Sequence, residues 1–440
     1  TYNYDNRYFV EGNFGYNGSE NFSPNHRFGF FPSIAVGYVV SNEKFFAPIR
    51  DVVSMVKLKA SYGLVGNDQI GGDRRFIYNE TVIGGGKYYF GTTPSQYTSV
   101  RLGEFPNPNV GWEKAKKLNL GADLSFFNQL NISVDYFKEN REGIFLQRKS
   151  IPMYVGLSTK PWVNIGKMRN SGIDASLEYH QPLGKDLHLT VRGNFTYARN
   201  RIMDQDEPDY AYTYMNHSGQ MQWQKFGLVA AGLFQDQEDI DSWAKQSFGE
   251  VKPGDIKYLD LNGDGIVDNY DTKPIGYSDI PEIVYGFGFS LQWKAFDLSA
   301  FFQGVAHVSF STLTDQTQAF VGRNLKESSV FADLYGNTWT PENPGAKYPR
   351  MTTGAIDNNN QLSTFWMANG RYLRLKNLEL GYTLPKRIAN KIAMQSLRVY
   401  LSGVNLFTFS PFKLWDPDLQ TGATNYPNNR IINLGLTIGF

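Results

Sequence analysis

The last ten residues alternate apolar with small or polar side chains, and this alternation limits the folds that the chain can adopt. Apolar residues stand at every second position: Ile432, Leu434, Leu436, Ile438 and Phe440. The positions between them hold Asn433, Gly435, Thr437 and Gly439. Because successive side chains of a strand point to opposite faces, one face would be wholly apolar. A soluble antiparallel sheet buries such a face in its core, whereas a transmembrane barrel turns it toward lipid.

The same alternation recurs along the chain, in segments of about ten residues, the length of a tilted strand that crosses a bilayer. Clear copies cover 118–126, 132–136, 173–180, 187–197 and 285–293, and weaker copies cover 8–16, 34–38 and 58–62. Aromatic residues make up 15% of the chain, which fits the aromatic girdles of outer-membrane barrels. No run of 18 apolar residues exists, so a helical membrane protein is excluded. The sequence predicts an all-β, transmembrane antiparallel β-barrel with roughly 12 strands in this chain.

Short and long connections alternate between these segments. Short ones are expected at 127–131, 182–185 and 294–295, and modest ones at 41–53 and 385–395. Long ones are expected at 16–27, 66–111, 141–164, 200–280, 309–369 and 410–429. Outer-membrane barrels have short periplasmic turns and long extracellular loops. We therefore expect function to reside in the long loops, the two longest of which have room for extra hairpins.

Composition excludes several other classes of protein. Cysteine is absent, so no disulfide, zinc–thiolate site or cysteine nucleophile can form. A net charge of +1 gives no electrostatic argument for nucleic acid. The five histidines show no metal-binding spacing, and no catalytic pair is evident, so we do not expect an enzyme. The chain begins at Thr1 without a signal pattern, and we expect it to be the carboxy-terminal part of a longer precursor.

Residues 260–271, which read DLNGDGIVDNYD, have the spacing of a calcium-binding loop. Oxygen ligands fall at loop positions 1, 3, 5, 9 and 12, which are Asp260, Asn262, Asp264, Asp268 and Asp271. Gly265 stands where the sharp turn needs glycine, and Ile266 would offer its backbone carbonyl. The alternative is an Asx-rich turn that needs no ion. The spacing predicts a structural calcium ion that rigidifies the long extracellular segment 200–280.

Tryptophans gather in the expected outer segments, where flat rings can stack on sugars or contact a partner that closes over the barrel. The candidates for such contacts are Trp162, Trp223, Trp243, Trp366 and Trp415. The alternative is that these rings pack the loops against one another.

Several short motifs occur in order along the chain. They are SYGLVGN at 61–67, NPNVGWE at 107–113, NIGKMRNSGI at 164–173, the segment 253–276 followed by Pro281, RYLRLKNLELGYTLP at 371–385 and RVYLSGVNLF at 398–407. Together with the terminal Phe440, this series resembles the SusC/RagA family of TonB-dependent outer-membrane transporters. The resemblance covers essentially the whole chain.

The resemblance implies a 22-stranded barrel with a plugged lumen in the bacterial outer membrane, of which residues 1–440 are the carboxy-terminal part. The plug domain, the TonB-binding segment and the early strands of the family are absent from this chain. It implies import of oligosaccharides or peptides, driven by the TonB complex, together with a SusD-like surface lipoprotein. The family also ends in an aromatic signal for the barrel-assembly machinery, matched here by Leu434, Leu436, Ile438 and Phe440. The alternative for these four residues is that they only face outer-membrane lipid.

Three other functions remain open at the level of sequence: a passive porin-like barrel, a calcium-dependent enzyme, and a soluble calcium-binding β-sheet protein that binds glycans. The direction of the apolar faces separates the barrels from the soluble protein. A barrel requires Leu120, Leu177, Phe289 and Leu436 to face outward, whereas a soluble sheet requires them to converge on a dry interior.

Overall fold

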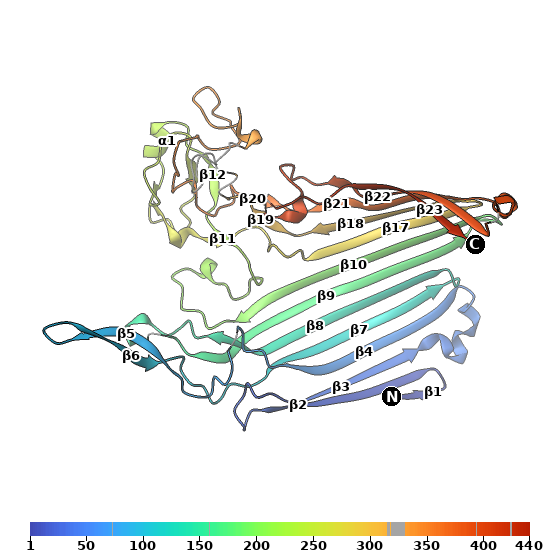
Figure 1. The fold of residues 1–440 in the computed structure, drawn as a ribbon, viewed down its shortest axis with the longest axis horizontal. Helices are drawn as coiled ribbons and strands as arrows, with labels where there is room; N and C mark the ends of the chain where they lie inside the picture. Colours follow the sequence, from blue (N-terminus) through green and yellow to red (C-terminus); the bar gives the residue numbers. More distant parts are fainter. Residues whose placement is uncertain (73, 158, 315–316, 318–330, 393, 423–424) are drawn as a thin grey trace.

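One large antiparallel sheet dominates the computed structural model, which describes residues 1–72, 74–157, 159–314, 317, 331–392, 394–422 and 425–440 (Figure 1). Thirteen strands follow one another in chain order, each hydrogen-bonded to the next. They are β1 (Tyr2–Tyr4), β2 (Tyr8–Gly18), β3 (Phe28–Val39), β4 (Val53–Asn67), β7 (Glu113–Phe126), β8 (Leu130–Gln147), β9 (Trp162–Pro182), β10 (Leu187–Asp204), β17 (Ile283–Trp293), β18 (Phe296–Ala306), β21 (Tyr372–Thr383), β22 (Ser396–Phe409) and β23 (Ile431–Gly439). Because β1 has only 3 residues, the long strands agree with the number predicted.

The connections alternate as the sequence predicts. At one end of the sheet, β7–β8, β9–β10 and β17–β18 are joined by tight turns, in which Phe127, Asn128 and Lys294 have positive φ. Two modest connections at this end contain short helices: η1 (Val40–Asn42) and η2 (Lys44–Ile49) in one, α2 (Lys386–Ala389) and η7 (Asn390–Ile392) in the other. All long connections, and thus the large irregular parts of the chain, lie at the opposite end, while the carboxy terminus lies at the end with the tight turns (Figure 1).

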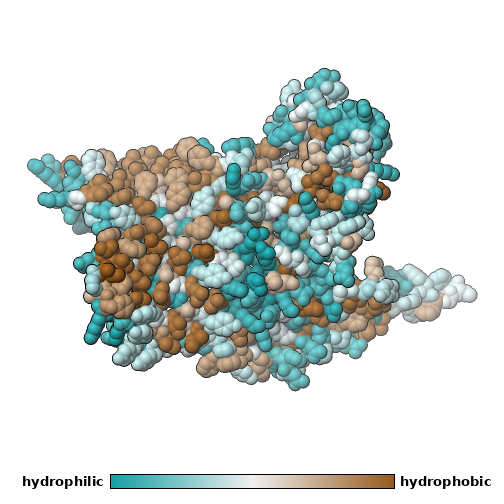
Figure 2. Space-filling model, turned by 180° about the vertical axis from the view of Figure 1, so that it is seen from behind, coloured by the Kyte–Doolittle hydropathy of each residue, from teal (hydrophilic) through white to brown (hydrophobic). Residues whose placement is uncertain are grey.

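Apolar side chains form one continuous face across the sheet. The register places Leu120 opposite Tyr136, Val191 opposite Phe289, and Val399 opposite Leu436, so side chains of the same kind meet across strand pairs. The four test residues are exposed: Leu120 by 46%, Leu177 by 37%, Phe289 by 37% and Leu436 by 64%. They do not converge on a dry interior, which confirms the outward orientation. Figure 2 shows apolar side chains gathered over the strand halves next to the tight turns.

In the part of the chain that the structure describes, no helix is long and apolar enough to cross a bilayer. A separate hairpin of β5 (Val82–Phe90) and β6 (Ser95–Leu102) extends away from the sheet (Figure 1). The connections also hold short 3-10 helices: η3 (Met153–Val155), η4 (Thr213–Met215), η5 (Asn269–Asp271), η6 (Ala332–Leu334) and η8 (Pro417–Leu419).

The two longest connections, 205–282 and 307–371, fold together into what we call the loop domain (Figure 1). Its elements are β11 (Phe226–Gly227), β12 (Ala230–Leu233), α1 (Gln237–Asp241), β13 (Lys245–Gln246), β14 (Ile256–Tyr258), β15 (Ile266–Val267), β16 (Lys273–Pro274), β19 (Ser309–Ser311) and β20 (Met367–Asn369). Both connections contribute to one apolar core, made of Leu228, Leu233, Ile256, Tyr258, Val267, Leu334, Trp339, Tyr348 and Trp366. The loop domain is thus a folded unit with its own core.

Candidate functional site

Charged residues form ion pairs on the face of the sheet opposite the apolar one. Lys59 of β4 lies 2.7 Å from Asp123 of β7 and 3.4 Å from Asp135 of β8, measured from Nζ to the carboxylate oxygens. Ser133 Oγ donates to Asp123 over 2.7 Å. Asp123 follows the outward-facing Ala122, so the strand alternation directs its carboxylate to the other face. This polar face is suited to water or to a polar protein surface, as in the interior of a large barrel.

A second set of ion pairs extends this polar face to the later strands. Arg398 of β22 donates to Asp297 of β18 and Glu379 of β21. Arg192 of β10 donates from Nε to Glu178 of β9 over 3.0 Å. Sequence reasoning did not pair these residues, because Arg398 and Asp297 are 101 positions apart. The arrangement forms a hydrophilic wall in which neighbouring charges largely neutralise one another.

A buried polar network joins the two segments of the loop domain. Asp255 is fully buried, and its carboxylate oxygens lie 2.8 Å from Arg350 Nε and 3.0 Å from Arg350 Nη2. Asn359 Nδ2 donates to the same carboxylate over 2.9 Å, while Asn359 Oδ1 accepts from the Ile256 amide over 2.8 Å. Because a buried charge is costly unless it is paired, this network fixes the relative position of the two segments. It was not identified from the sequence, where Asp255 and Arg350 are 95 positions apart.

The aspartate-rich loop 260–271 is closed by hydrogen bonds within the protein. Asp260 accepts from the backbone amides of Gly263 over 2.7 Å and Gly265 over 2.8 Å. Asn262 Oδ1 accepts from the Asp264 amide over 3.0 Å. Gly265 has φ of +84°, as the predicted sharp turn requires. These contacts are those of an Asx-rich turn, the alternative to calcium.

The end of this loop is held in the same way. Asp271 is fully buried and accepts from the backbone amides of Leu261 over 2.6 Å and Asp268 over 2.8 Å. Ile266 lies in β15, which pairs in parallel with β13. Within the described ranges, no group of three or more acidic or histidine side chains is arranged to hold a metal ion. Calcium at this loop therefore stays a prediction that rests on the spacing alone.

Three of the five predicted tryptophans contact other parts of the protein, Trp162 in strand β9 and the other two in the loops. Trp162 stacks on Phe145 with ring centroids 5.2 Å apart. Trp243 Nε1 donates to the carbonyl of Tyr258 over 2.7 Å. Trp415 contacts three aromatic rings, those of Phe310, Phe331 and Phe412. Each of these three rings therefore already has at least one contact within the protein.

The other two tryptophans have contrasting environments. Trp223 is 63% exposed and has a backbone φ of +58°, so its ring is available to a ligand or a partner. Trp366 is only 4% exposed, and its indole N–H donates to the carbonyl of Asn359 over 2.8 Å. Trp366 is therefore fixed by the buried network that also holds Asp255.

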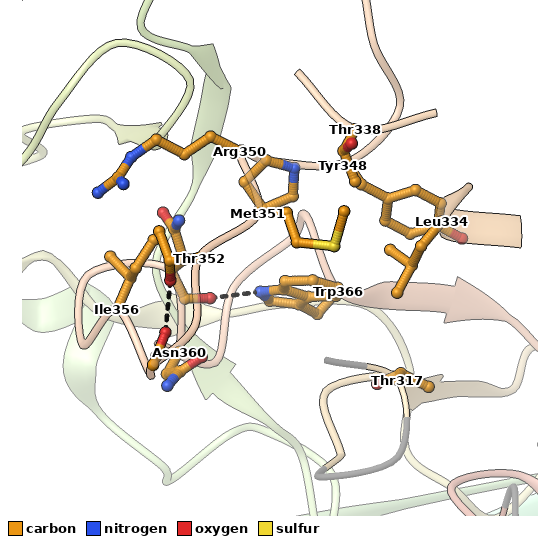
Figure 3. A pocket seen from close by; sticks show the side chains of 13 residues that line it. Thr317, Leu334, Thr338, Tyr348, Arg350, Met351, Thr352, Ile356, Asn360 and Trp366 are labelled. Atoms are coloured by element: carbon orange, nitrogen blue, oxygen red, sulfur yellow. Dashed lines mark hydrogen bonds between the residues drawn. The ribbon is translucent and has the colours of Figure 1, made fainter. Parts of the chain in front are cut away.

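Trp366 lines a cavity of about 60 Å³ in the loop domain (Figure 3). The other lining residues are Thr317, Leu334, Thr338, Tyr348, Pro349, Arg350, Met351, Thr352, Gly354, Ile356, Asn359 and Asn360. Figure 3 shows the Met351 and Leu334 side chains directed toward Trp366. The sequence identified only Trp366, because the remaining lining residues follow no helix or strand periodicity.

Two titratable groups at the base of the loop domain have shifted pKa values. Burial alone would raise the pKa of Asp206, but hydrogen bonds from Ser150 and Arg148 hold it below its usual value. Burial lowers the pKa of His217, whose ring stacks on Phe226 with centroids 3.9 Å apart, and the carboxylate of Glu207 only partly opposes this. Both shifts favour the native contacts at neutral pH.

Comparison with known proteins assigns the family. Residues 1–406 match the family model described as TonB dependent receptor-like, beta-barrel. The chain is 30% identical to TonB-dependent receptor P3 of Formosa agariphila over 100% of this chain and 44% of that protein. It is 27% identical to TonB-dependent receptor SusC of Bacteroides thetaiotaomicron over 99% of this chain and 42% of that protein. The chain thus spans less than half the length of these curated relatives.

Solved structures show the same fold. The RagAB peptide importer in its open-open state superposes with a TM-score of 0.76 at 22% identity, over 100% of this chain and 46% of that chain. Its closed-closed state gives a TM-score of 0.75. The outward apolar face, the paired charges on the opposite face and the long connections at one end all fit this architecture. The chain belongs to the TonB-dependent receptor-like β-barrel family and forms part of an outer-membrane barrel.

Proposed function

We propose that this chain forms the carboxy-terminal wall and the extracellular loop domain of a nutrient importer for oligosaccharides or peptides. The observation that carries the proposal is the pairing of a lipid-facing apolar surface with a charged inner wall below a folded loop domain. A wall of this kind encloses a polar passage. The loop domain, with its own core, gives this passage a specific entrance.

The edges of the sheet bear on how the barrel closes. Within the described residues, β1 pairs only with β2 and β23 only with β22. Unpaired strand edges are not tolerated in the hydrocarbon region, because each free backbone group costs several kcal/mol there. We infer that further strands of the full-length protein pair with both edges and complete the barrel.

The proposed partners follow from the same family. A SusD-like surface lipoprotein would close over the loop domain, and the TonB complex would act through a part of the protein outside this chain. The exposed Trp223 and the projecting β5–β6 hairpin offer surface for contact with such a lipoprotein. Membership of the TonB-dependent family supports energy coupling over passive flow.

Uptake by cells tests the proposal. A strain that lacks the full-length gene should lose accumulation of labelled oligosaccharides or peptides, and the restored gene should recover it. A protonophore, or loss of TonB, should abolish uptake while the amount of barrel in the outer membrane stays unchanged. Uptake that persists without TonB would instead support the passive porin-like alternative.

A further inference from the structure

The cavity beside Trp366 is separate from the charged inner wall of the sheet, since its lining among the described residues consists of Thr317 and residues between 334 and 366 of the loop domain. Its walls are held before any ligand arrives. The Trp366 indole is fixed by the Asn359 carbonyl, and the Tyr348 hydroxyl donates to Asp333. A preformed cavity of this kind binds a ligand without first ordering its own residues.

The size of the cavity limits the group that fits. A cavity of about 150 Å³ takes up a benzene molecule, with its six carbon atoms. The cavity here has about 60 Å³, so by the same ratio it accommodates a group of about two or three heavy atoms. A sugar ring with its hydroxyl groups is larger than benzene and does not fit. Nor can a sugar stack on the face of Trp366, which is only 4% exposed.

The lining favours an uncharged, apolar group. Leu334, Met351 and Ile356 supply aliphatic surface beside the indole of Trp366. The charged lining residue, Arg350, is already paired with the buried Asp255. A charged ligand would lose its water here without gaining a free counter-charge, whereas an aliphatic group loses nothing on leaving water.

The rim of the cavity offers backbone groups to an extended ligand. Met351 is 43% exposed at the rim, and Thr352 follows it. The backbone amides and carbonyls of Met351 and Thr352 have no hydrogen-bond partner among the residues that the structure describes. An extended peptide that passes beside such a segment can hydrogen-bond to its free groups while placing one side chain in the adjacent pocket.

We propose that this cavity binds a small aliphatic side chain, of the size of Val, from an extended peptide that hydrogen-bonds to free backbone groups of Met351 or Thr352. The inference rests on the proposed import function and names peptides, not oligosaccharides, as its cargo. The cavity would then select which peptides the loop domain retains at the entrance.

Peptide binding to the full-length protein in detergent tests this site. The probes are fluorescein-labelled Ala-Ala-Val-Ala-Ala and the same peptide with Gly at the centre. Burial of one valine side chain gives about a tenfold or greater preference for the valine peptide. The variant Met351→Trp fills the rim of the cavity and should reduce the preference to less than about twofold. The matched control Thr353→Trp, at the exposed neighbouring residue outside the lining, should keep it.

Other outcomes decide against the proposal. Equal binding of the two peptides by the wild-type protein overturns it, as does an equal loss of preference in both tryptophan variants. If Met351→Trp instead weakens binding of a purified surface lipoprotein and leaves peptide binding unchanged, the cavity holds a side chain of that partner. If cells import oligosaccharides but no peptides, this inference fails while the import function stands. If cells import neither, the import function fails, and the binding measurement still reports on the cavity.

Discussion

At the scale of single residues, burial decides which charges matter most for stability. The inner-wall ion pairs keep partial contact with solvent, as in the Lys59–Asp123 pair, whose side chains are 31% and 24% exposed. Exposed or half-exposed pairs contribute little to stability. Asp255 is different because it is fully buried against Arg350.

Removal of the charge on Asp255 should therefore destabilise the loop domain. The variant Asp255→Asn leaves Arg350 without its counter-charge, and breaking a buried pair in this way costs about 3–5 kcal/mol. We expect faster cleavage of the loop domain in limited proteolysis and faster amide exchange in β14. The control Glu250→Gln changes a carboxylate that is 83% exposed and should have no effect. Unchanged proteolysis of Asp255→Asn would show that Arg350 finds another partner.

The stability of the base of the loop domain should depend on pH through His217. Its pKa in the folded protein lies below the usual value of 6.5, so the unfolded chain binds a proton more readily. The contribution of neutral His217 is thus complete above pH 6.5 and is lost as the pH falls below that value. The protection factors for hydrogen exchange of residues 205–225, which correct for the slower intrinsic exchange at low pH, should fall between pH 7.5 and pH 5. The variant His217→Phe keeps the stacking on Phe226 and should weaken this pH dependence; an unchanged dependence would exclude His217 as its cause.

At the scale of elements, the loop 260–271 has two interpretations that one measurement separates. If calcium binds, the ion should protect residues 205–282 from proteolysis relative to a chelator, and Asp264→Asn should remove the protection. Asp241→Asn, in the exposed helix α1, is the control and should retain it. If calcium has no effect on the wild-type protein, the backbone hydrogen bonds alone hold the loop, as in an Asx-rich turn.

The apolar residues at the end of the chain have two interpretations, a recognition signal for the barrel-assembly machinery and simple contact with lipid. Two variants in and beside the last strand, β23, distinguish them. The variant Phe440→Ala should lower the amount of folded barrel in the outer membrane, measured by heat-modifiable migration in gels. Ile432→Ala removes apolar surface from the same face of β23, away from the terminus, and should have a smaller effect. Equal losses in the two variants would indicate that Phe440 acts only by facing lipid.

At the scale of the whole molecule, the two faces of the sheet should differ in how well they tolerate a charged side chain. An arginine at Leu120 would face lipid, with a cost of up to about 2–4 kcal/mol at the bilayer midplane. An arginine at the adjacent Asn119 would face the polar interior and should be tolerated. Denaturant unfolding in lipid vesicles should show a lower midpoint for Leu120→Arg than for Asn119→Arg. The reverse order would contradict the assigned orientation.

The sequence by itself determined the strands, their two faces and the alternation of connections, because the two-residue period and the turn residues are local properties of the chain. The tertiary structure alone decided which polar residues meet. Asp255 reaches Arg350 across 95 positions, and the cavity beside Trp366 brings together residues from Thr317 to Trp366 of a single folded connection. In loop 260–271 the sequence shows only the spacing of the carboxylates, whereas the tertiary structure shows that they accept hydrogen bonds from backbone amides. Such contacts depend on how distant segments pack, and no periodicity in the sequence encodes them.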